Sequence, residues 1–254
     1  MNDLVLYSSF NTFYMLPKSI NPCPIIDAVI EIRFEVNLFS NAVFGIIYKE
    51  FQSEYPEVEK LPILQIPEQV RDNDPNFKYK PHYKIYNSNY AVQIGSDVIS
   101  FCSKIPYKGW VDFSKNAFTF LEKLFGLKII TKINRLGLRY VNFFNSDIYN
   151  KTNLQLIISD ENVISKNLTI RTEILKNDFV NLVLFANNVQ ILIEGINSTG
   201  SIIDIDTFKE FNDNNFIQNY QNEIVQAHKI EKEIFFSLLN SKFLTTLNPV
   251  YETN

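Results

Sequence analysis

The chain contains few of the residues from which most recognisable catalytic sites are built. Its 254 residues include two cysteines, two histidines and seven glycines. So few cysteines and histidines argue against a disulfide framework and against a zinc cluster. The glycines form neither G-x-x-x-x-G-K-S/T nor G-x-G-x-x-G, which argues against the ATP and dinucleotide sites that these loops build. The sequence therefore predicts no metal, no cofactor and no familiar catalytic motif.

Long apolar runs and excess positive charge are also missing. No stretch approaches 18 apolar residues, so the sequence predicts no membrane contact through a spanning helix. The net charge of −4 argues against bulk attraction to nucleic acid or anionic lipid, although it leaves room for a local basic patch. The first residues lack the basic start and the cleavage site of a signal peptide. We therefore expect a cytoplasmic protein with free thiols.

Arginine is scarce as well, and its placement is informative. Of the five arginines, four fall in segments that look like β-strands. Residues 24–36 alternate apolar side chains with charged ones, and residues 132–143 place Arg135, Gly137 and Arg139 on one face of a strand. Because the charges on the two segments are complementary, we expect them to lie in one sheet. Glu31 or Asp27 should then be near Arg135 or Arg139.

The remaining pattern predicts an α+β fold with antiparallel sheets and helices packed on one face. The order is β-α-β-meander-α-β followed by β-meander-α, which is compatible with a two-fold internal repeat. We expect a leader at 1–23, a first subdomain at 24–148 and a second at 149–254, all in one compact unit. Helices are expected at 40–54, 110–124 and 207–241, the last with a break near 212–215. Strands are expected at 25–36, 62–66, 83–86, 90–94, 97–103, 132–144, 153–158, 166–176, 179–187, 189–196 and 201–206.

Four strings in the first part of the chain resemble a family of uncharacterised proteins found sporadically in bacteria and archaea. They are PIIDAVIEIRF, VQIGSDVISF, YKGWVDF and RLGLRYVN, in the family's order. Asp27 stands where the family has glutamate. The resemblance implies no activity. Sporadic occurrence is typical of horizontally transferred genes, so it implies an accessory role in a mobile or defence gene cassette.

The charged strand faces form the first candidate site. Asp27, Glu31, Arg33, Arg135 and Arg139 are either a structural lattice of ion pairs or a surface that recognises a partner. Arginine binds carboxylate and phosphate through two parallel hydrogen bonds, and a glycine between two arginines allows close approach. A further candidate is the only tryptophan, at position 110, which is either a plug that anchors a helix or a platform for a planar ligand.

Two weaker candidates involve carboxylates. Asp204 and Asp206 alternate onto one side of a strand and, with Glu194, could hold a divalent cation. The alternative is that Asp206 or Thr207 caps a following helix. The second candidate is a helical spacing that brings His228 and Glu231 onto one face, with Glu223 about a turn and a half earlier. That spacing suits either proton transfer or an ordinary surface hydrogen bond.

Three functions remain open from the sequence. The first is a non-catalytic binding or assembly protein, the second a metal-assisted hydrolase, and the third an accessory factor that binds nucleic acid. For the first, the partner is another protein or a second copy of the chain. Apolar residues spread around more than one stripe of the helix at 216–239, and that breadth predicts a homodimer interface unless the chain's own core covers them.

Overall fold

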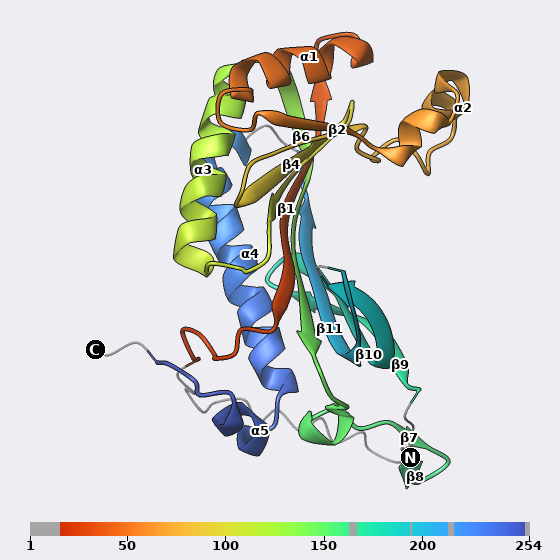
Figure 1. The fold of residues 1–254 in the computed structure, drawn as a ribbon, viewed down its shortest axis with the longest axis vertical. Coiled ribbons are helices and arrows are strands. Elements are labelled where there is room, and N and C mark those ends of the chain that lie inside the picture. The colour runs from red at the N-terminus through yellow and green to blue at the C-terminus, as the bar shows by residue number, and fades with distance from the viewer. Residues whose placement is uncertain (1–15, 163–166, 194, 213–215, 252–254) are drawn as a thin grey trace, which may run out of the picture.

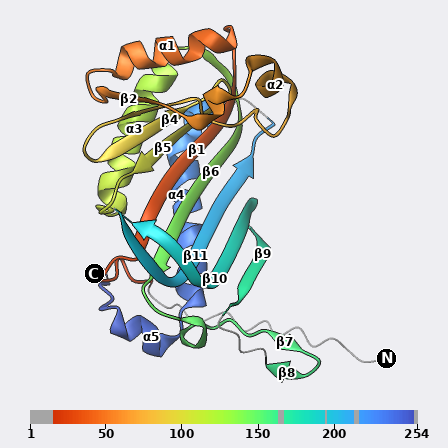
Figure 2. The ribbon, with the colours of Figure 1, turned by 45° about the vertical axis from the view of Figure 1, so that its right-hand side comes forward.

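The computed structural model describes residues 16–162, 167–193, 195–212 and 216–251, and within them the chain forms one large antiparallel sheet. The nine strands run in the order β2-β3-β4-β5-β1-β6-β11-β10-β9 (Figures 1 and 2). A separate small hairpin pairs β7 with β8. The α+β class with an antiparallel sheet is therefore as the sequence predicts. The strands of the large sheet are Ile25–Val36 (β1), Glu57–Lys60 (β2), Tyr83–Tyr86 (β3), Tyr90–Ile94 (β4), Val98–Ser103 (β5), Ile130–Phe144 (β6), Thr169–Lys176 (β9), Phe179–Ile193 (β10) and Ile196–Glu210 (β11).

The centre of the sheet is the antiparallel pair β1–β6, which places the two charged segments side by side. Alternate residues of β1 are buried on one face, namely Ala28, Ile30, Ile32 and Phe34. Their neighbours in the chain face the other way, so the period of two separates a core face from a charged face. The expectation that the two segments lie in one sheet is confirmed.

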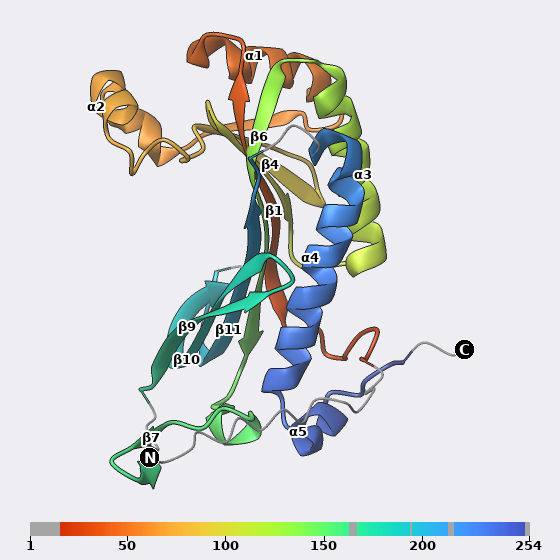
Figure 3. The same ribbon diagram turned by 180° about the vertical axis from the view of Figure 1, so that it is seen from behind.

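Three helices cover the core face of the sheet and one stands on the other side. Figures 1 and 3 show α1, α3 and α4 along one face, whereas α2 projects beside the opposite face. Helix α3 buries a stripe that recurs every three or four residues and includes Phe113, Phe120 and Leu124. The helices are Ser40–Phe51 (α1), Glu68–Asn73 (α2), Trp110–Gly126 (α3), Phe216–Leu238 (α4) and Ser241–Thr246 (α5).

The order of the strands places the two halves of the chain symmetrically about the centre. From β1 the sheet continues outward through β5, β4 and β3, and from β6 it continues through β11, β10 and β9. Each meander is followed in sequence by a long helix, α3 in the first half and α4 in the second. This arrangement is what the proposed repeat requires. The subdomain boundary at 148 stays a prediction, because β6 and β11 join both halves in one sheet.

The hairpins of the second half differ from the expected ones at one point. The predicted turn at Asn177-Asp178 is present, and both residues have positive φ, as a two-residue hairpin loop needs. The second expected turn, at Asn187-Asn188, is wrong. There the strand continues through a bulge, with Asn188 at φ 54°, and pairs with β11 on both sides. Asparagine tolerates positive φ, so β10 can hold one extra residue as a bulge and continue as a strand beyond it.

The last expected helix begins later than predicted. Residues 207–210 belong to β11, and α4 begins at Phe216. Thr207 does not cap a helix. Its hydroxyl is buried in the sheet and donates to Asn181 Oδ1 at 2.7 Å. The predicted cap is thus wrong, because pairing of β11 with β6 and β10 satisfies this backbone better than a helix start would.

Three local expectations in the loops are also corrected. Pro62–Gln65 forms a short 3-10 helix (η1) in place of a strand, and the strand lies just before it, in β2. Arg71 lies in α2, where a loop is expected, and its Nε donates to the Ile66 carbonyl oxygen. Of residues 153–158, only Ile157–Ile158 (β7) are in a strand, and these pair with Glu161–Asn162 (β8). A second 3-10 helix, Tyr149–Lys151 (η2), follows β6.

Most of the apolar surface of α4 is covered by the chain itself. Ile230 is buried and Phe236 is partly buried, whereas Val225 is exposed. The breadth of the apolar pattern is therefore mainly explained by the core, and homodimerisation remains a prediction. Within the described residues, no helix combines the length and the apolar character needed to cross a membrane.

Gly200 sits where the backbones of β11 and β6 approach closely. A Cβ atom there would lie 2.0 Å from the Phe144 carbonyl oxygen, which cannot move without breaking the ladder. We expect Gly200→Ala to lower the free energy of unfolding by about 1–3 kcal/mol. Gly45, in α1, has open space around its Cα. Gly45→Ala should raise stability by about 0.5–1 kcal/mol. Urea denaturation of both variants checks this, and equal effects would contradict it.

Candidate functional site

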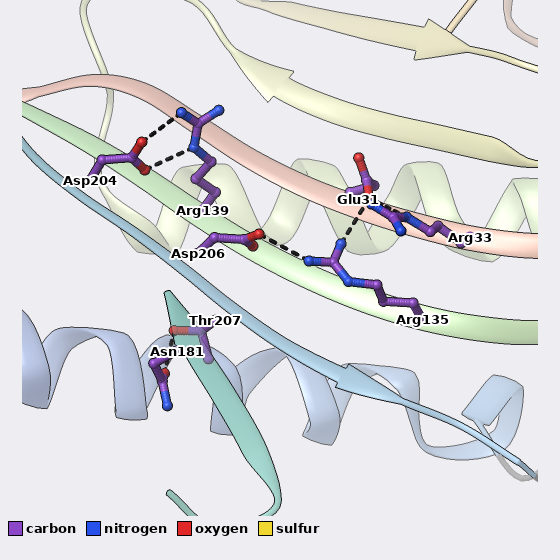
Figure 4. A network of polar contacts seen from close by, with 8 residues as sticks. All are labelled: Glu31, Arg33, Arg135, Arg139, Asn181, Asp204, Asp206 and Thr207. Carbon is purple, nitrogen blue, oxygen red and sulfur yellow. Dashed lines mark hydrogen bonds and ion pairs between the residues drawn. The ribbon is translucent and has the colours of Figure 1, made fainter. Parts of the chain in front are cut away.

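The charged side chains of β1, β6 and β11 form a network centred on Arg135 and a separate Arg139–Asp204 pair on the face that α1, α3 and α4 leave uncovered. We call this surface, defined by Glu31, Arg33, Arg135, Arg139, Asp204 and Asp206, the lattice face (Figure 4). The strand register brings these side chains side by side. For example, Arg139 of β6 is paired with Val29 of β1 on one side and with Asp206 of β11 on the other. Three strands far apart in sequence therefore contribute to one continuous surface.

Arg135 is the centre of this network. Its Nη1 donates to Glu31 Oε1 at 2.8 Å and its Nη2 donates to Asp206 Oδ2 at 2.9 Å. The side chain is only 10% exposed, and its guanidinium carbon lies 4.2 Å from the centre of the Phe208 ring. Arg135 thus bridges two carboxylates on opposite sides of β6 while an aromatic ring shields it from water. This contact confirms the expectation that Glu31 lies near Arg135.

Arg139 forms a separate pair at the same face. Its Nε and Nη2 donate to the two oxygens of Asp204 at 2.8 and 2.7 Å, in the planar two-bond geometry that arginine favours (Figure 4). Hydrogen bonding to Asp204 raises the pKa of Arg139, so it keeps its charge. Burial raises the pKa of Asp27, although the nearby Arg139 charge lowers it. Unlike Arg135, Arg139 has a side chain that is 46% exposed.

Arg33 completes the network at its other end. Its Nε donates to Glu31 Oε1 at 2.8 Å, so Glu31 accepts from two arginines. The Arg33 guanidinium carbon also lies 4.5 Å from the centre of the Tyr79 ring. Gly137 leaves space for the Arg135 side chain, because a Cβ atom at position 137 would lie only 2.9 Å from Arg135 Nη1. Glycine at this position therefore lets the buried guanidinium lie flat across β6.

A hollow of about 430 Å³ opens on the lattice face. Its lining adds Arg171 from β9 to the predicted residues, and Leu182 and Leu184 from β10 form an apolar side. Arg171 is exposed and makes no hydrogen bond or ion pair with any other described residue. Sequence reasoning missed Arg171, because only the pairing of β9 with β10 and β10 with β11 brings it here. The remaining lining residues are Val29, Glu31, Arg33, Arg135, Gly137, Arg139, Val183, Asp204 and Asp206.

Trp110 does not belong to this face. It begins α3 on the helix-covered side, where its ring stacks on His228 with 3.8 Å between centroids and an interplanar angle of 8°. Both residues line a second cavity, of about 290 Å³. Trp110 and the arginines, which the sequence offers as candidates for binding, therefore lie on opposite sides of the sheet, because Trp110 follows a loop that leads to the other layer.

His228 and Glu231 come together as their helical spacing indicates. Both line the second cavity, whereas Glu223 points elsewhere and pairs with Lys209 at 3.2 Å. Burial lowers the pKa of His228 to about 3 and raises the pKa of Glu231 to about 8. With these pKa values both side chains are mostly uncharged at neutral pH, which for a glutamate is a departure from its usual state. Sequence reasoning missed the other walls, including Tyr107, Tyr140 and Cys23, which arrive from distant parts of the chain.

Two of the three carboxylates proposed as ligands of a divalent cation accept hydrogen bonds from arginine instead. Asp204 is held by Arg139 and Asp206 by Arg135, and Glu194 lies outside the described residues. Burial raises the pKa of Asp206, against the lowering effect of Arg135. Across the described residues, no group of three or more His, Cys, Asp or Glu side chains is placed to hold a metal ion.

Comparison with known proteins adds no assignment. No protein-family model matches the chain, and the search of curated proteins finds no match.

Proposed function

We propose that this is a non-catalytic binding protein of the cytoplasm that holds a protein partner against the lattice face. The observation that carries the proposal is the hollow beside Arg171, which is lined by four arginines and three carboxylates on the sheet face opposite α1, α3 and α4. Arg135 and Arg33 are engaged within the chain. Arg171 has no such engagement among the described residues, and Arg139 is half exposed. The chemistry that fits is a carboxylate carried by an acidic segment of the partner.

The mixed charge of the hollow favours a protein over nucleic acid. A polyanion would place phosphates beside Glu31, Asp204 and Asp206 as well as beside the arginines. The net charge of −4 adds long-range repulsion. An acidic peptide can instead direct one carboxylate at Arg171 and lay apolar side chains on Leu182 and Leu184, which form the apolar side of the hollow.

Selection of random peptides displayed on phage against the purified protein tests the proposal. We expect the selected peptides to be enriched in aspartate and glutamate. The variant Arg171→Glu should weaken their binding by at least about tenfold, because it replaces an attractive charge with a repulsive one. The matched control is Lys115→Glu, the same change of charge at an exposed position of α3 on the opposite side of the sheet. That variant should leave the affinity unchanged.

Selected peptides without acidic enrichment, or equal affinities in the two variants, would overturn the proposal. Binding of random-sequence DNA or RNA that Arg171→Glu abolishes would support the nucleic-acid alternative in its place. Light scattering of the pure protein supplies the remaining comparison. A dimer that dissociates in Arg171→Glu would mean that the lattice face serves self-association and not a different protein.

A further inference from the structure

The second cavity lies on the opposite layer from the lattice face. It is enclosed by α4, by the start of α3 and by residues 18–25, with Tyr140 of β6 contributing from the sheet. Its volume of about 290 Å³ is near the lower end of small-molecule sites. Nothing in the proposed binding of a protein to the lattice face uses this space.

Of the residues that line this cavity, Glu231 says most about the ligand that would fit. The residue is 5% exposed and lines the cavity, yet its carboxyl makes no hydrogen bond with any other described residue. Among the described residues no fully buried side-chain nitrogen or oxygen lacks a hydrogen-bond partner, so the Glu231 oxygens are accessible from the cavity, where water or a ligand can satisfy them. Burial raises its pKa to about 8. At neutral pH the carboxyl therefore keeps its proton, so one oxygen donates a hydrogen bond while the other accepts one.

The other inner walls are planar and uncharged. Trp110 and His228 stack face to face, and the Tyr140 hydroxyl lies 3.4 Å from His228 Nδ1 and 3.3 Å from the Tyr107 hydroxyl. Burial lowers the pKa of His228 to about 3 and raises the pKa of both tyrosines above its ordinary value. The interior thus offers aromatic surfaces and neutral polar groups, which suit a flat, uncharged ring.

The charges at the cavity lie toward solvent and are positive. Lys18 and Lys108 are exposed lining residues, and Lys232 is partly buried beside Glu231. Lys108 Nζ donates to Asn89 Oδ1 at 2.9 Å, so this ammonium group is held by the turn before β4 in the absence of a ligand. Lysine binds phosphate and carboxylate groups as a point charge. A ligand whose ring enters the cavity would therefore carry its anionic group at this rim.

We propose that this cavity binds a planar nitrogen heterocycle with an amino group beside a ring nitrogen acceptor and with an anionic substituent, such as a nucleoside monophosphate. The protonated Glu231 carboxyl matches that edge: its hydroxyl donates to the ring nitrogen and its carbonyl oxygen accepts from the amino group. Adenine and cytosine present such an edge, whereas guanine presents two adjacent donors and uracil lacks the amino group. Lys18 and Lys108 meet the anion.

The chain supplies two reporters for this cavity. Trp110 is its only tryptophan, and Cys23 is an exposed lining residue whereas the other thiol, Cys102, is buried. We would titrate the protein at pH 7 with AMP, CMP, GMP and UMP. The readouts are tryptophan fluorescence and the rate of alkylation of Cys23 by iodoacetamide. We expect AMP and CMP to give saturable fluorescence changes and to slow alkylation several-fold, with affinities at least about tenfold higher than those of GMP and UMP.

Substitutions at Glu231 separate recognition from folding. Glu231→Leu removes an unpaired buried carboxyl and should fold, yet it should weaken AMP binding by at least about tenfold. Glu231→Gln should keep AMP affinity within about threefold, because an amide also donates and accepts toward adenine. The control Lys229→Ala, an exposed position on α4, should change nothing. A double variant, Lys18→Ala with Lys108→Ala, should reduce AMP affinity to that of adenosine.

The pH dependence adds an independent check. AMP affinity should fall above about pH 8 as Glu231 ionises, and Glu231→Gln should remove that fall. The other ionisable groups of this cavity are His228 and Lys232 from α4, Lys18 and Cys23 from the leading segment, Tyr107 and Lys108 before α3, and Tyr140 from β6. Absence of saturable binding by all four nucleotides, binding of ribose 5-phosphate as tight as that of AMP, or unchanged AMP binding in Glu231→Leu would each overturn the proposal.

Discussion

Replacing Arg135 by methionine should lower the free energy of unfolding by about 3–5 kcal/mol, because the change leaves Asp206 without its arginine and leaves Glu31 with Arg33 alone. The Arg135 side chain is only 10% exposed, and it donates to both carboxylates at 2.8 and 2.9 Å. Methionine fills much of the same volume, so the expected loss reports the lost charge pairing of Asp206 and Glu31 more than a void. Urea denaturation at neutral pH measures it.

Arg139 provides the matched control on the same strand. It also forms two short hydrogen bonds to a carboxylate, but its side chain is 46% exposed. Water therefore replaces much of what Arg139 itself loses, but Asp204, whose side chain is 14% exposed, loses this pair, so Arg139→Met should cost about 1–2 kcal/mol, less than Arg135→Met. A triple variant that replaces Arg135, Glu31 and Asp206 with apolar residues should recover most of the stability that Arg135→Met loses. Equal losses for the two single variants would mean that the Arg135 bridge is as solvated as a surface pair.

The second large effect is a fall in stability between pH 6.5 and 8 that disappears in Glu231→Gln. Burial raises the pKa of Glu231 from 4.5 to about 8, so between these values the folded chain holds a proton that the unfolded chain has lost. Stability therefore decreases with rising pH in that window. Burial lowers the pKa of His228 from 6.5 to about 3, so there the unfolded chain binds the extra proton and stability increases with pH up to 6.5.

The two groups together predict a distinctive profile. Their contributions oppose each other between pH 4.5 and 6.5, and only the Glu231 contribution remains above pH 6.5. Its slope is about 1.4 kcal/mol per pH unit, or about 2 kcal/mol across the upper window. Urea denaturation at several pH values measures the profile. Taking the difference between wild type and variant removes the slopes of Asp27 and Asp206, whose pKa values burial also raises.

His228→Phe keeps a ring beside Trp110 and serves as the complementary variant. It should remove the opposing His228 contribution, so that stability falls with rising pH already from pH 4.5, and it should leave the fall above pH 6.5 unchanged. A wild-type profile parallel to that of Glu231→Gln between pH 6.5 and 8 would show that the carboxyl is hydrated or paired in solution. In that case its protonated form would also be ruled out as the basis of heterocycle recognition.

The strand periodicity in the sequence was sufficient to predict the part of the lattice face on β1 and β6, but not that Asp204 and Asp206 of β11 join it. In β1 and β6 each side chain alternates between two environments, so charge and apolarity alone assign the faces, and complementary charge then pairs the strands. The same reasoning failed at Asn187-Asn188. A turn and a bulge use the same residue types and both accept positive φ, and only the partner strand distinguishes them.

The sequence by itself determined the α+β class, the charged faces of the central strands and the shared helical face of His228 and Glu231, because these depend on periods of two and 3.6 residues. Only the tertiary structure decided that Arg171 joins the lattice face, that Trp110 lies on the other layer, and that Tyr107, Tyr140 and Cys23 enclose Glu231. These groupings join positions far apart in the chain. The packing of strands and helices, which no local pattern encodes, sets both their proximity and the burial that shifts their pKa values.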